Sequence, residues 1–358
     1  LNYLLDAFID AKEYGSILCL EKRDYVGLLR AWNLTASQTT ENLNLTLWFA
    51  AVEHEIPKLI EQAIILTQGY DVVVTNPPYM AVSNAGAKVN DYVKKNFPDS
   101  KADLFAVFIE RCGQMAKKNG YQAMITQHAW MFLSSFEKLR TKLLTVDIVN
   151  MAHLGARAFE EIGGEVVQTT SFVIRKSHIA DYKGEYCRLI EPTSQQGKED
   201  MFLAGENRYA ADQSNFSKIP GSPVAYWVSS AFLRAFETGV LLGKIADAKQ
   251  GVATADNNRF LRLWNEVSIN KVSFHTHSHE EAAIAREKWF PYNKGGDFRK
   301  WYGNNEFVVN WEHDGAELKQ FKGSVLRNPS YYFKECFSWS LISSSVAAFR
   351  YKPAGQIF

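Results

Sequence analysis

The stretch that decides the fold is Tyr70-Asp71-Val72-Val73-Val74-Thr75-Asn76-Pro77-Pro78-Tyr79. Its short β-branched run, residues 72–74, is typical of a strand that is buried on both faces of a parallel sheet. The Asn-Pro-Pro-Tyr sequence follows directly, and ligands bind at the carboxyl ends of strands in α/β sheets. The stretch therefore predicts a buried strand followed by a functional turn.

Helix and strand patterns alternate on both sides of this strand, through about residue 150. Apolar residues at helical spacing predict helices, and short apolar runs predict strands. In chain order we expect a helix over 45–66 that Pro57 kinks or restarts, the strand at 70–74, a helix over 103–118 that ends in Lys117-Lys118-Asn119-Gly120, a strand over 121–125, a helix over 136–144 and, at 166–174, one arm of a terminal hairpin. This order predicts a doubly wound α/β sheet.

The composition suits a packed protein of about two domains. At roughly 150 residues per domain, 358 residues give about two, and 46% hydrophobic with 22% charged residues argues against disorder. A polar stretch after residue 190 places the boundary. We expect one domain over 1–190, a linker or crossover over 191–240 and a second domain over 241–358.

Charge and cysteine content limit the partners and the compartment. Because 40 Lys+Arg nearly cancel 39 Asp+Glu, any nucleic acid must be met by a local basic patch. The longest apolar run, residues 47–52, is far shorter than the roughly 18–20 residues that span a bilayer. The widely spaced cysteines indicate reduced thiols in a cytoplasmic protein that has no membrane partner. The chain begins at Leu1 without an initiator Met, which suggests an excised fragment.

The turn at 76–79 suits chemistry on an amine whose lone pair is delocalised into a π-system. The side-chain oxygen of Asn76 and the carbonyl of Pro77 can accept hydrogen bonds from the two N–H groups of such an amine and so localise that lone pair. Consecutive prolines, Pro77 and Pro78, keep the turn rigid, and Tyr79 offers a flat face on which a base can stack. No general base is required. The alternative is an ordinary polar turn after a strand.

Longer phrases of the sequence carry a resemblance. Residues 70–80 resemble motif IV of the amino-group methyltransferases that use S-adenosylmethionine, specifically the adenine-specific DNA class. Other phrases are similar to the PglX-type methyltransferases of BREX phage-defence systems: 99–105 (Asp-Ser-Lys-Ala-Asp-Leu-Phe), 130–140, 153–159, 163–170, 291–296 and 299–305. The resemblance covers most of the chain from about residue 45 onward.

This resemblance implies methyl transfer from S-adenosylmethionine to the 6-amino group of adenine in double-stranded DNA, with Asn76, Pro77, Pro78 and Tyr79 as the catalytic turn. It implies a Rossmann-like methyltransferase sheet, incomplete at its N-terminal side, followed by a mixed α+β target-recognition domain. Other phage-defence proteins are possible partners. The family also has a glycine-rich cofactor loop before the catalytic turn, which this sequence lacks. We therefore expect that loop upstream of Leu1, and weak or absent cofactor binding and no activity from this fragment alone.

The region 286–311 is rich in aromatic residues interleaved with cations. Such a surface suits phosphates and base edges, and a loop at 251–260 resembles the opening of target-recognition domains in this family. The candidate DNA-binding residues are Asn257, Arg259, Lys294, Arg299, Lys300, Trp301 and Tyr302. The alternative is a β-rich aromatic core with a solvated basic rim.

Other polar residues have plainer explanations. The His275, His277 and His279 series is expected to lie in a surface loop and not at a metal site. His128 is more simply a structural histidine, and Asp103 a helix-start residue. No metal-dependent nuclease pattern follows Pro98.

Three other functions remain open at this point. The chain could be a DNA-recognition or assembly module without chemistry. The same turn could instead methylate a protein glutamine amide, although the aromatic and basic C-terminal region has no purpose there. Cytosine 4-amino methylation is a near neighbour that is disfavoured only because Asn76 opens the turn where Ser would be expected.

Overall fold

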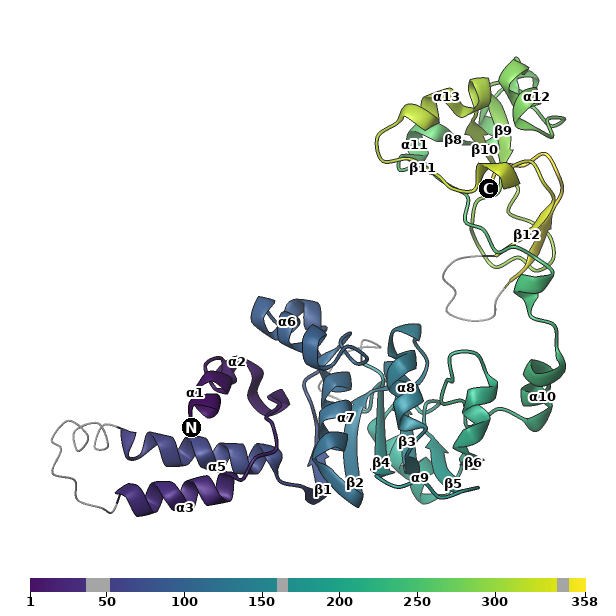
Figure 1. Cartoon of the computed structure of the whole chain (residues 1–358). Helices are drawn as coiled ribbons and strands as arrows, with labels where there is room; N and C mark the ends of the chain where they lie inside the picture. The colour runs from purple at the N-terminus through teal and green to yellow at the C-terminus, as the bar shows by residue number, and fades with distance from the viewer. Residues whose placement is uncertain (37–51, 160–166, 340–347) are drawn as a thin grey trace. The chain divides into compact units, whose positions relative to one another are not determined.

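The computed structural model describes residues 1–36, 52–159, 167–339 and 348–358. The chain folds into two compact units, Leu1–Gly239 and Val240–Phe358 (Figure 1). The first part of the helix expected over 45–66 lies outside the described residues. Its second part is α5, Glu55–Thr67, with Pro57 in its first turn, where proline is tolerated.

The first unit is built on a six-stranded sheet with the order β1-β2-β4-β3-β5-β6. Its strands are β1 (Tyr70–Thr75), β2 (Ala116–Gln127), β3 (Asp147–Gly155), β4 (Thr169–Arg175), β5 (Lys183–Arg188) and β6 (Arg208–Asp212). The pairs β1–β2 and β3–β5 are parallel, whereas β2–β4, β3–β4 and β5–β6 are antiparallel. The predicted α/β class is confirmed, and the sheet is mixed.

The helices of the first unit follow the expected alternation. They are α1 (Asn2–Ala7), α2 (Ala11–Tyr14), α3 (Tyr25–Ala36), α5, α6 (Ala87–Asn96), α7 (Leu104–Met115), α8 (Glu137–Leu143), α9 (Gln195–Leu203) and α10 (Ser230–Thr238). Helix α7 packs against β1 and β2 (Figure 1). Its Phe105 and Ile109 join Met124 of β2 and Phe172 of β4 in the largest buried cluster. This core fixes the positions of the strand ends.

Strand β1 differs from the expectation that both of its faces are buried. It is the edge strand of the described sheet, and Val72 and Val74 are 56% and 70% exposed. The strand predicted from the β-branched run is present, because such side chains favour an extended backbone whether or not a neighbouring element covers them. Composition alone therefore could not tell an edge from an interior position.

Helix α7 ends earlier than predicted. Its last residue is Met115, and Lys117 and Lys118 lie in β2 and not in a last helical turn. The Lys176 ammonium donates to the carbonyl of Ala116 at 2.7 Å, so the lysine that follows β4 supplies the cation at this helix end. The predicted stop at Gly120 is wrong because the strand begins before it.

Residues after 166 are arranged differently from a terminal hairpin. Strand β4 does pair antiparallel with β3, but it lies between β2 and β3 in the interior of the sheet. The stretch 191–240, expected as a linker or crossover, contains α9, β6 and α10, and β6 pairs with β5. Residues 191–239 fold with the first unit.

The second unit is a smaller α+β fold. A three-stranded sheet has the order β8-β10-β9, and two ribbons pair β11 with β7 and β12 with β13. Its elements are β7 (Val252–Ala253), α11 (Asn257–Phe260), β8 (Leu261–Leu263), α12 (His279–Ile284), β9 (Trp289–Tyr292), β10 (Phe307–Asn310), α13 (Glu312–Gln320), β11 (Val325–Leu326), β12 (Cys336–Ser338) and β13 (Arg350–Lys352). Its buried cluster includes Phe260, Phe290, Val309 and Trp311.

In the part of the chain that the structure describes, no helix combines the length and the apolar character needed to cross a bilayer.

Candidate functional site

The Asn-Pro-Pro-Tyr turn, residues 76–79, lies at the carboxyl end of β1. Thr75, the last residue of β1, pairs with Met124 of the parallel strand β2. Asn76 is exposed, while Pro77 behind it is buried. The Asn76 carboxamide makes no hydrogen bond to any residue that the structure describes. Its oxygen is therefore available to an incoming N–H donor.

Asp103 fixes the far end of this turn. Its carboxylate is the N-cap of α7, where it accepts from the backbone N–H of Phe105 at 3.2 Å, and it also accepts from the N–H of Met80 at 3.1 Å. The Leu104 N–H donates to the Met80 carbonyl at 3.0 Å. Burial raises the pKa of Asp103, and these backbone donors oppose that shift. The predicted helix-start role is confirmed, and the same residue ties the turn to the helix.

The Tyr79 ring is held by packing. It meets the Phe105 ring edge to face, with 6.3 Å between the ring centroids. Its hydroxyl is buried and has no hydrogen-bond partner among the described residues, and burial raises the pKa of Tyr79 to about 12. Without a hydrogen bond to direct the hydroxyl, the orientation of this side chain depends on the ring and its contact with Phe105.

His128 follows β2 at the same end of the sheet, within a buried chain of hydrogen bonds. Its Nδ1 lies 2.8 Å from Nε2 of His153, and Nδ1 of His153 lies 3.1 Å from the Tyr226 hydroxyl. Burial lowers the pKa of His128, and it lowers the pKa of His153 to about 3 with the adjacent His128 as the next cause. Both imidazoles are therefore neutral at pH 7 and act as internal hydrogen-bonding groups. The contribution of Tyr226, far away in the sequence, could not be predicted.

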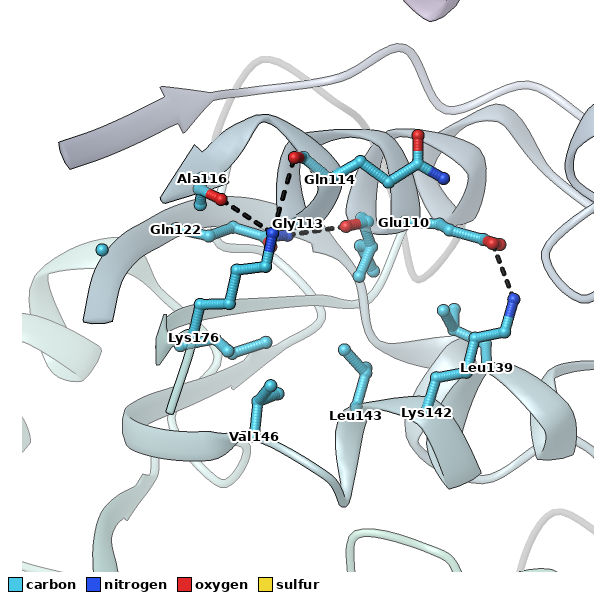
Figure 2. Close-up of a pocket in the computed structure, with 13 residues that line it drawn as sticks. Glu110, Gly113, Gln114, Ala116, Gln122, Leu139, Lys142, Leu143, Val146 and Lys176 are labelled. Carbon is cyan, nitrogen blue, oxygen red and sulfur yellow. Dashed lines mark hydrogen bonds and ion pairs between the residues drawn. The ribbon is translucent and has the colours of Figure 1, made fainter. Parts of the chain in front are cut away.

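A cavity of about 250 Å³ lies at the other end of the sheet (Figure 2). It opens between α7 and α8 beside the amino-terminal end of β2, away from the turn at the carboxyl end of β1. Its floor is apolar, and its rim carries the Lys142–Glu110 ion pair at 2.7 Å and the Lys176 ammonium. The lining residues are Ile109, Glu110, Gly113, Gln114, Ala116, Gly120, Gln122, Leu139, Lys142, Leu143, Val146, Ile174 and Lys176. This cavity contains none of the residues predicted for catalysis.

In the second unit, Asn257 and Arg259 are engaged in internal contacts. The Asn257 carboxamide oxygen accepts from the Thr254 hydroxyl at 2.6 Å. The Arg259 guanidinium donates to the Glu317 carboxylate at 2.6 Å and lies over the Phe321 ring. These contacts fix the orientation of both side chains before any partner arrives.

The predicted residues from 299 to 302 form one exposed loop. Trp301 and Tyr302 are 64% and 66% exposed, and the Lys300 ammonium lies 5.2 Å from the centre of the Trp301 ring. Lys294 contacts a different ring, that of Phe307, at 4.4 Å. The structure thus groups the aromatic pair with Lys300 and Arg299, as a surface and not as a core.

The sequence reasoning missed an aromatic ribbon and the two cations behind it. Strands β12 and β13 and their ends carry exposed Phe337, Trp339, Phe349 and Tyr351. Arg350 and Lys352, at the alternate positions of β13, are 1% and 0% exposed. The period-two alternation of aromatic and polar residues at 337–339 and 349–352 was a signal that could have found this ribbon.

The histidine series at 275–279 has a structural explanation. His279 Nδ1 lies 2.7 Å from the Asp314 carboxylate, and its Nε2 lies 2.8 Å from the Pro329 carbonyl. Across residues 1–36, 52–159, 167–339 and 348–358, no three side chains of the ligating types gather in a way that could hold a metal ion.

The sheet and the turn at the end of β1 define the class of protein. Residues 16–159 match the family model described as "Eco57I restriction-modification methylase". The first unit is therefore related to DNA-modifying methylases.

The relatives are more specific. The chain is 42% identical over 383 residues to the adenine-specific methyltransferase PglX of Lacticaseibacillus casei (strain Zhang), with 100% of this chain and 31% of the relative covered. It is 39% identical over 360 residues to the adenine-specific methyltransferase BrxX of Escherichia coli O9:H4 (strain HS), with 99% of this chain and 28% of the relative covered. A solved structure, the DrdV–DNA complex, is similar at a TM-score of 0.38 and 13% identity, over 65% of this chain and 25% of that one.

The chain is thus related to the PglX-type adenine-specific methyltransferases, and the resemblance stated from the sequence is confirmed. It spans 31% and 28% of the length of these two relatives.

Proposed function

We propose that the protein to which this chain belongs methylates the 6-amino group of adenine in double-stranded DNA. The observation that carries the proposal is the exposed Asn76 carboxamide, which has no partner among the described residues and stands beside the buried Pro77 at the carboxyl end of β1. The relatives named as adenine-specific methyltransferases support the choice of substrate.

The turn would act by binding the amine as it becomes more nucleophilic. The Asn76 side-chain oxygen and the Pro77 carbonyl would accept hydrogen bonds from the two N–H groups of the amine. These hydrogen bonds strengthen as positive charge develops on the nitrogen. Tyr79 would stack on the base after it leaves the duplex. Pro77 and Pro78 keep the acceptors fixed, so that no reorganisation is needed during the reaction. The extra proton would pass to water after transfer.

The methyl group would come from S-adenosylmethionine, which supplies an electrophilic sulfonium methyl. The described residues do not form a cradle for it: between residue 1 and β1 the described elements are helical, and no strand end followed by a glycine-rich loop is among them. We therefore assign to this chain the amine-binding half of the site and expect weak or absent cofactor binding by the chain alone.

The second unit would recognise DNA. We propose Arg299, Lys300, Trp301 and Tyr302 as direct contacts, with Lys294 beside them and with Asn257 and Arg259 as a pre-oriented pair. In this proposal residues 1–190 belong to the catalytic domain and 241–358 to the target-recognition domain. The protein would work in the cytoplasm, with other phage-defence proteins as partners.

Replacement of Asn76 by Ala in the intact protein tests the proposal. We expect methylation of DNA by the Asn76→Ala variant to fall by about 10²–10³-fold, as for other removed transition-state acceptors and donors, with DNA affinity changed by less than about threefold. Asn84→Ala, an equal truncation at another exposed asparagine in the following segment, is the matched control and should retain activity.

Near-normal methyl transfer by Asn76→Ala would refute the role of the turn. Loss of modified adenine with retained DNA binding would separate this proposal from a purely DNA-recognising module. Transfer of methyl groups to a glutamine-containing protein in place of DNA would favour the glutamine alternative.

A further inference from the structure

The loop at residues 299–304, here the Trp301 loop, has an unusual backbone. Trp301 has a φ of +72°, followed by Gly303 at +127° and Asn304 at +53°. Positive φ is well tolerated by glycine and asparagine but is an outlier for a bulky side chain such as that of tryptophan. Strain of this kind persists only where surrounding structure holds it, and it concentrates at functional positions.

Backbone hydrogen bonds hold Trp301 from both sides. Its N–H donates to the Phe349 carbonyl at 2.7 Å, and its carbonyl accepts from the Tyr351 N–H at 2.9 Å. Trp301 thus pairs with the end of β13 in a parallel bridge to Arg350. The main chain at this residue is fixed, although the side chain is exposed.

A buried lysine clamps the rest of the loop. The Lys352 ammonium donates to the carbonyls of Gly303 and Asn304, both at 2.8 Å, and to the Asn305 side-chain oxygen at 2.5 Å. The Asn304 carboxamide donates in turn to the Asp297 carbonyl at 3.1 Å. Burial lowers the pKa of Lys352 to about 8, with the positive charge of Arg350 as the next cause. A cation is therefore kept in an unfavourable place where it secures this loop.

The charges around the loop favour a polyanion over an apolar partner. The exposed Arg299 and Lys300 form no ion pair with any acidic residue in the described chain, whereas Arg350 and Lys352 are buried beneath the loop. Asp297 and Glu306 are the acids of the same segment. Unpaired cations beside an exposed indole match a nucleic acid, which offers phosphates and stacked bases together.

We propose that the Trp301 loop is a wedge that inserts the Trp301 ring between neighbouring base pairs of the bound duplex. The inference rests on the proposed function and specifies how the second unit engages DNA. Apolar side chains inserted at a base step unstack it and kink the duplex, at a cost that further protein–DNA contacts repay. Lys352 and the backbone hydrogen bonds to Phe349 and Tyr351 hold the main chain of the loop in place before DNA binds, so that binding costs less conformational entropy.

The wedge is tested with the intact protein and a duplex that carries its own methylation site, read beforehand by sequencing of modified bases. 2-Aminopurine, whose fluorescence rises when it is unstacked, replaces single bases at successive positions outside the target adenine. We expect one step at which binding raises the fluorescence. Trp301→Ala should abolish this rise and weaken binding by about tenfold, the loss typical of one stacking contact.

Two further variants complete the design. Phe298→Ala removes an aromatic ring that is 57% exposed in the same segment but has no positive φ, and it should keep both the fluorescence rise and the affinity. Trp301→Phe keeps an aromatic ring and should recover part of the rise, which separates loss of the wedge from misfolding of the loop.

A rise that persists in Trp301→Ala, or the absence of any unstacked step in a bound wild-type complex, would overturn the wedge and leave the methyltransferase proposal standing. Normal DNA affinity in Trp301→Ala would also overturn it and assign the ring to a protein partner. Failure of the wild-type protein to bind any duplex would contradict the proposed function itself, and the wedge with it.

Discussion

The turn at 76–79 and the Trp301 loop both present an exposed group on a fixed backbone, but they are made rigid in different ways. The turn uses covalent stiffness, since Pro77 and Pro78 restrict the chain, and none of its residues has positive φ. The Trp301 loop uses strain that the buried Lys352 and two backbone hydrogen bonds restrain. The turn is therefore encoded locally, whereas the loop depends on residues some fifty positions further along the chain.

This difference sets how each region should fail. A locally encoded turn needs only to be anchored at its ends, so its weak point is the anchor, Asp103. A strained loop loses its shape when the distant clamp is removed, so its weak point is Lys352. A fall in pH destabilises both units, in different pH ranges, because the buried imidazole of His153 in the first unit and the buried ammonium of Lys352 in the second both have a lowered pKa.

Among the changes that test this contrast, the largest effect is expected from loss of the anchor. Asp103→Ala releases the Met80 N–H and the first turn of α7, and misplacement of the turn should lower kcat/KM for DNA methylation by about 100-fold. Loss of the N-cap should also cost about 1–2 kcal/mol of stability. Steady-state methylation and urea unfolding measure the two effects.

Asp103→Asn is the matched variant, since its carboxamide oxygen can still accept both N–H groups. It should recover most of the activity. An Asp103→Ala variant with wild-type kcat/KM would show that the turn is rigid without its anchor, and an inactive Asp103→Asn would point to a need for the charge.

A smaller effect is expected on the stability of the first unit at low pH. The pKa of His153 is about 3 in the folded chain against an ordinary 6.5. As the pH falls, the unfolded chain therefore binds a proton at His153 before the folded chain does. Stability from this group is complete above pH 6.5 and is lost as the pH falls toward 3, by about 2 kcal/mol between pH 6.5 and 5. Urea unfolding of the first unit at both pH values measures it.

His153→Gln removes the titrating group and should flatten that pH dependence, whereas His54→Gln, at an exposed position of the same unit, should leave it unchanged. An equally steep loss of stability in His153→Gln would show that other groups cause it.

The smallest effect is expected on the stability of the second unit at high pH, and it arises from Lys352. The pKa of Lys352 is about 8 in the folded chain against an ordinary 10.5, so between these values the unfolded chain binds a proton that the folded chain lacks. Stability of the second unit should therefore rise with pH, by about 1 kcal/mol from pH 8 to 9. Lys352→Met should remove this rise, and an unfolding curve that still shows it in Lys352→Met would exclude Lys352 as the source.

The contrast also explains what the sequence could predict. The turn, its strand and the role of Asp103 were predicted because proline, β-branched residues and a helix cap act through their immediate neighbours. The edge position of β1 was missed because it depends on which strands surround it. The end of α7 was missed because β2 begins at Ala116. Lys176, the residue after β4, takes the place at the helix end that was expected for Lys117 and Lys118.

The candidate DNA surface was predicted in part for the same reason. Trp301 and Tyr302 were identified from a local excess of aromatic and basic residues, and they are exposed. Their backbone strain, and the lysine that sustains it, arise from pairing between residues 301 and 350–352. A pattern confined to one segment carries no information about such pairing.

The exposed edge of β1 has a practical consequence for work with this segment in isolation. Val72 and Val74 are exposed on a strand that forms the edge of the sheet among the described residues, and a Lys117–Asp71 ion pair lies at the start of this strand. Strands of this kind pair with one another between molecules unless something covers them. Chains of this length handled at high concentration should therefore self-associate edge to edge, and precipitation would reflect an uncovered strand and not a failure of the fold.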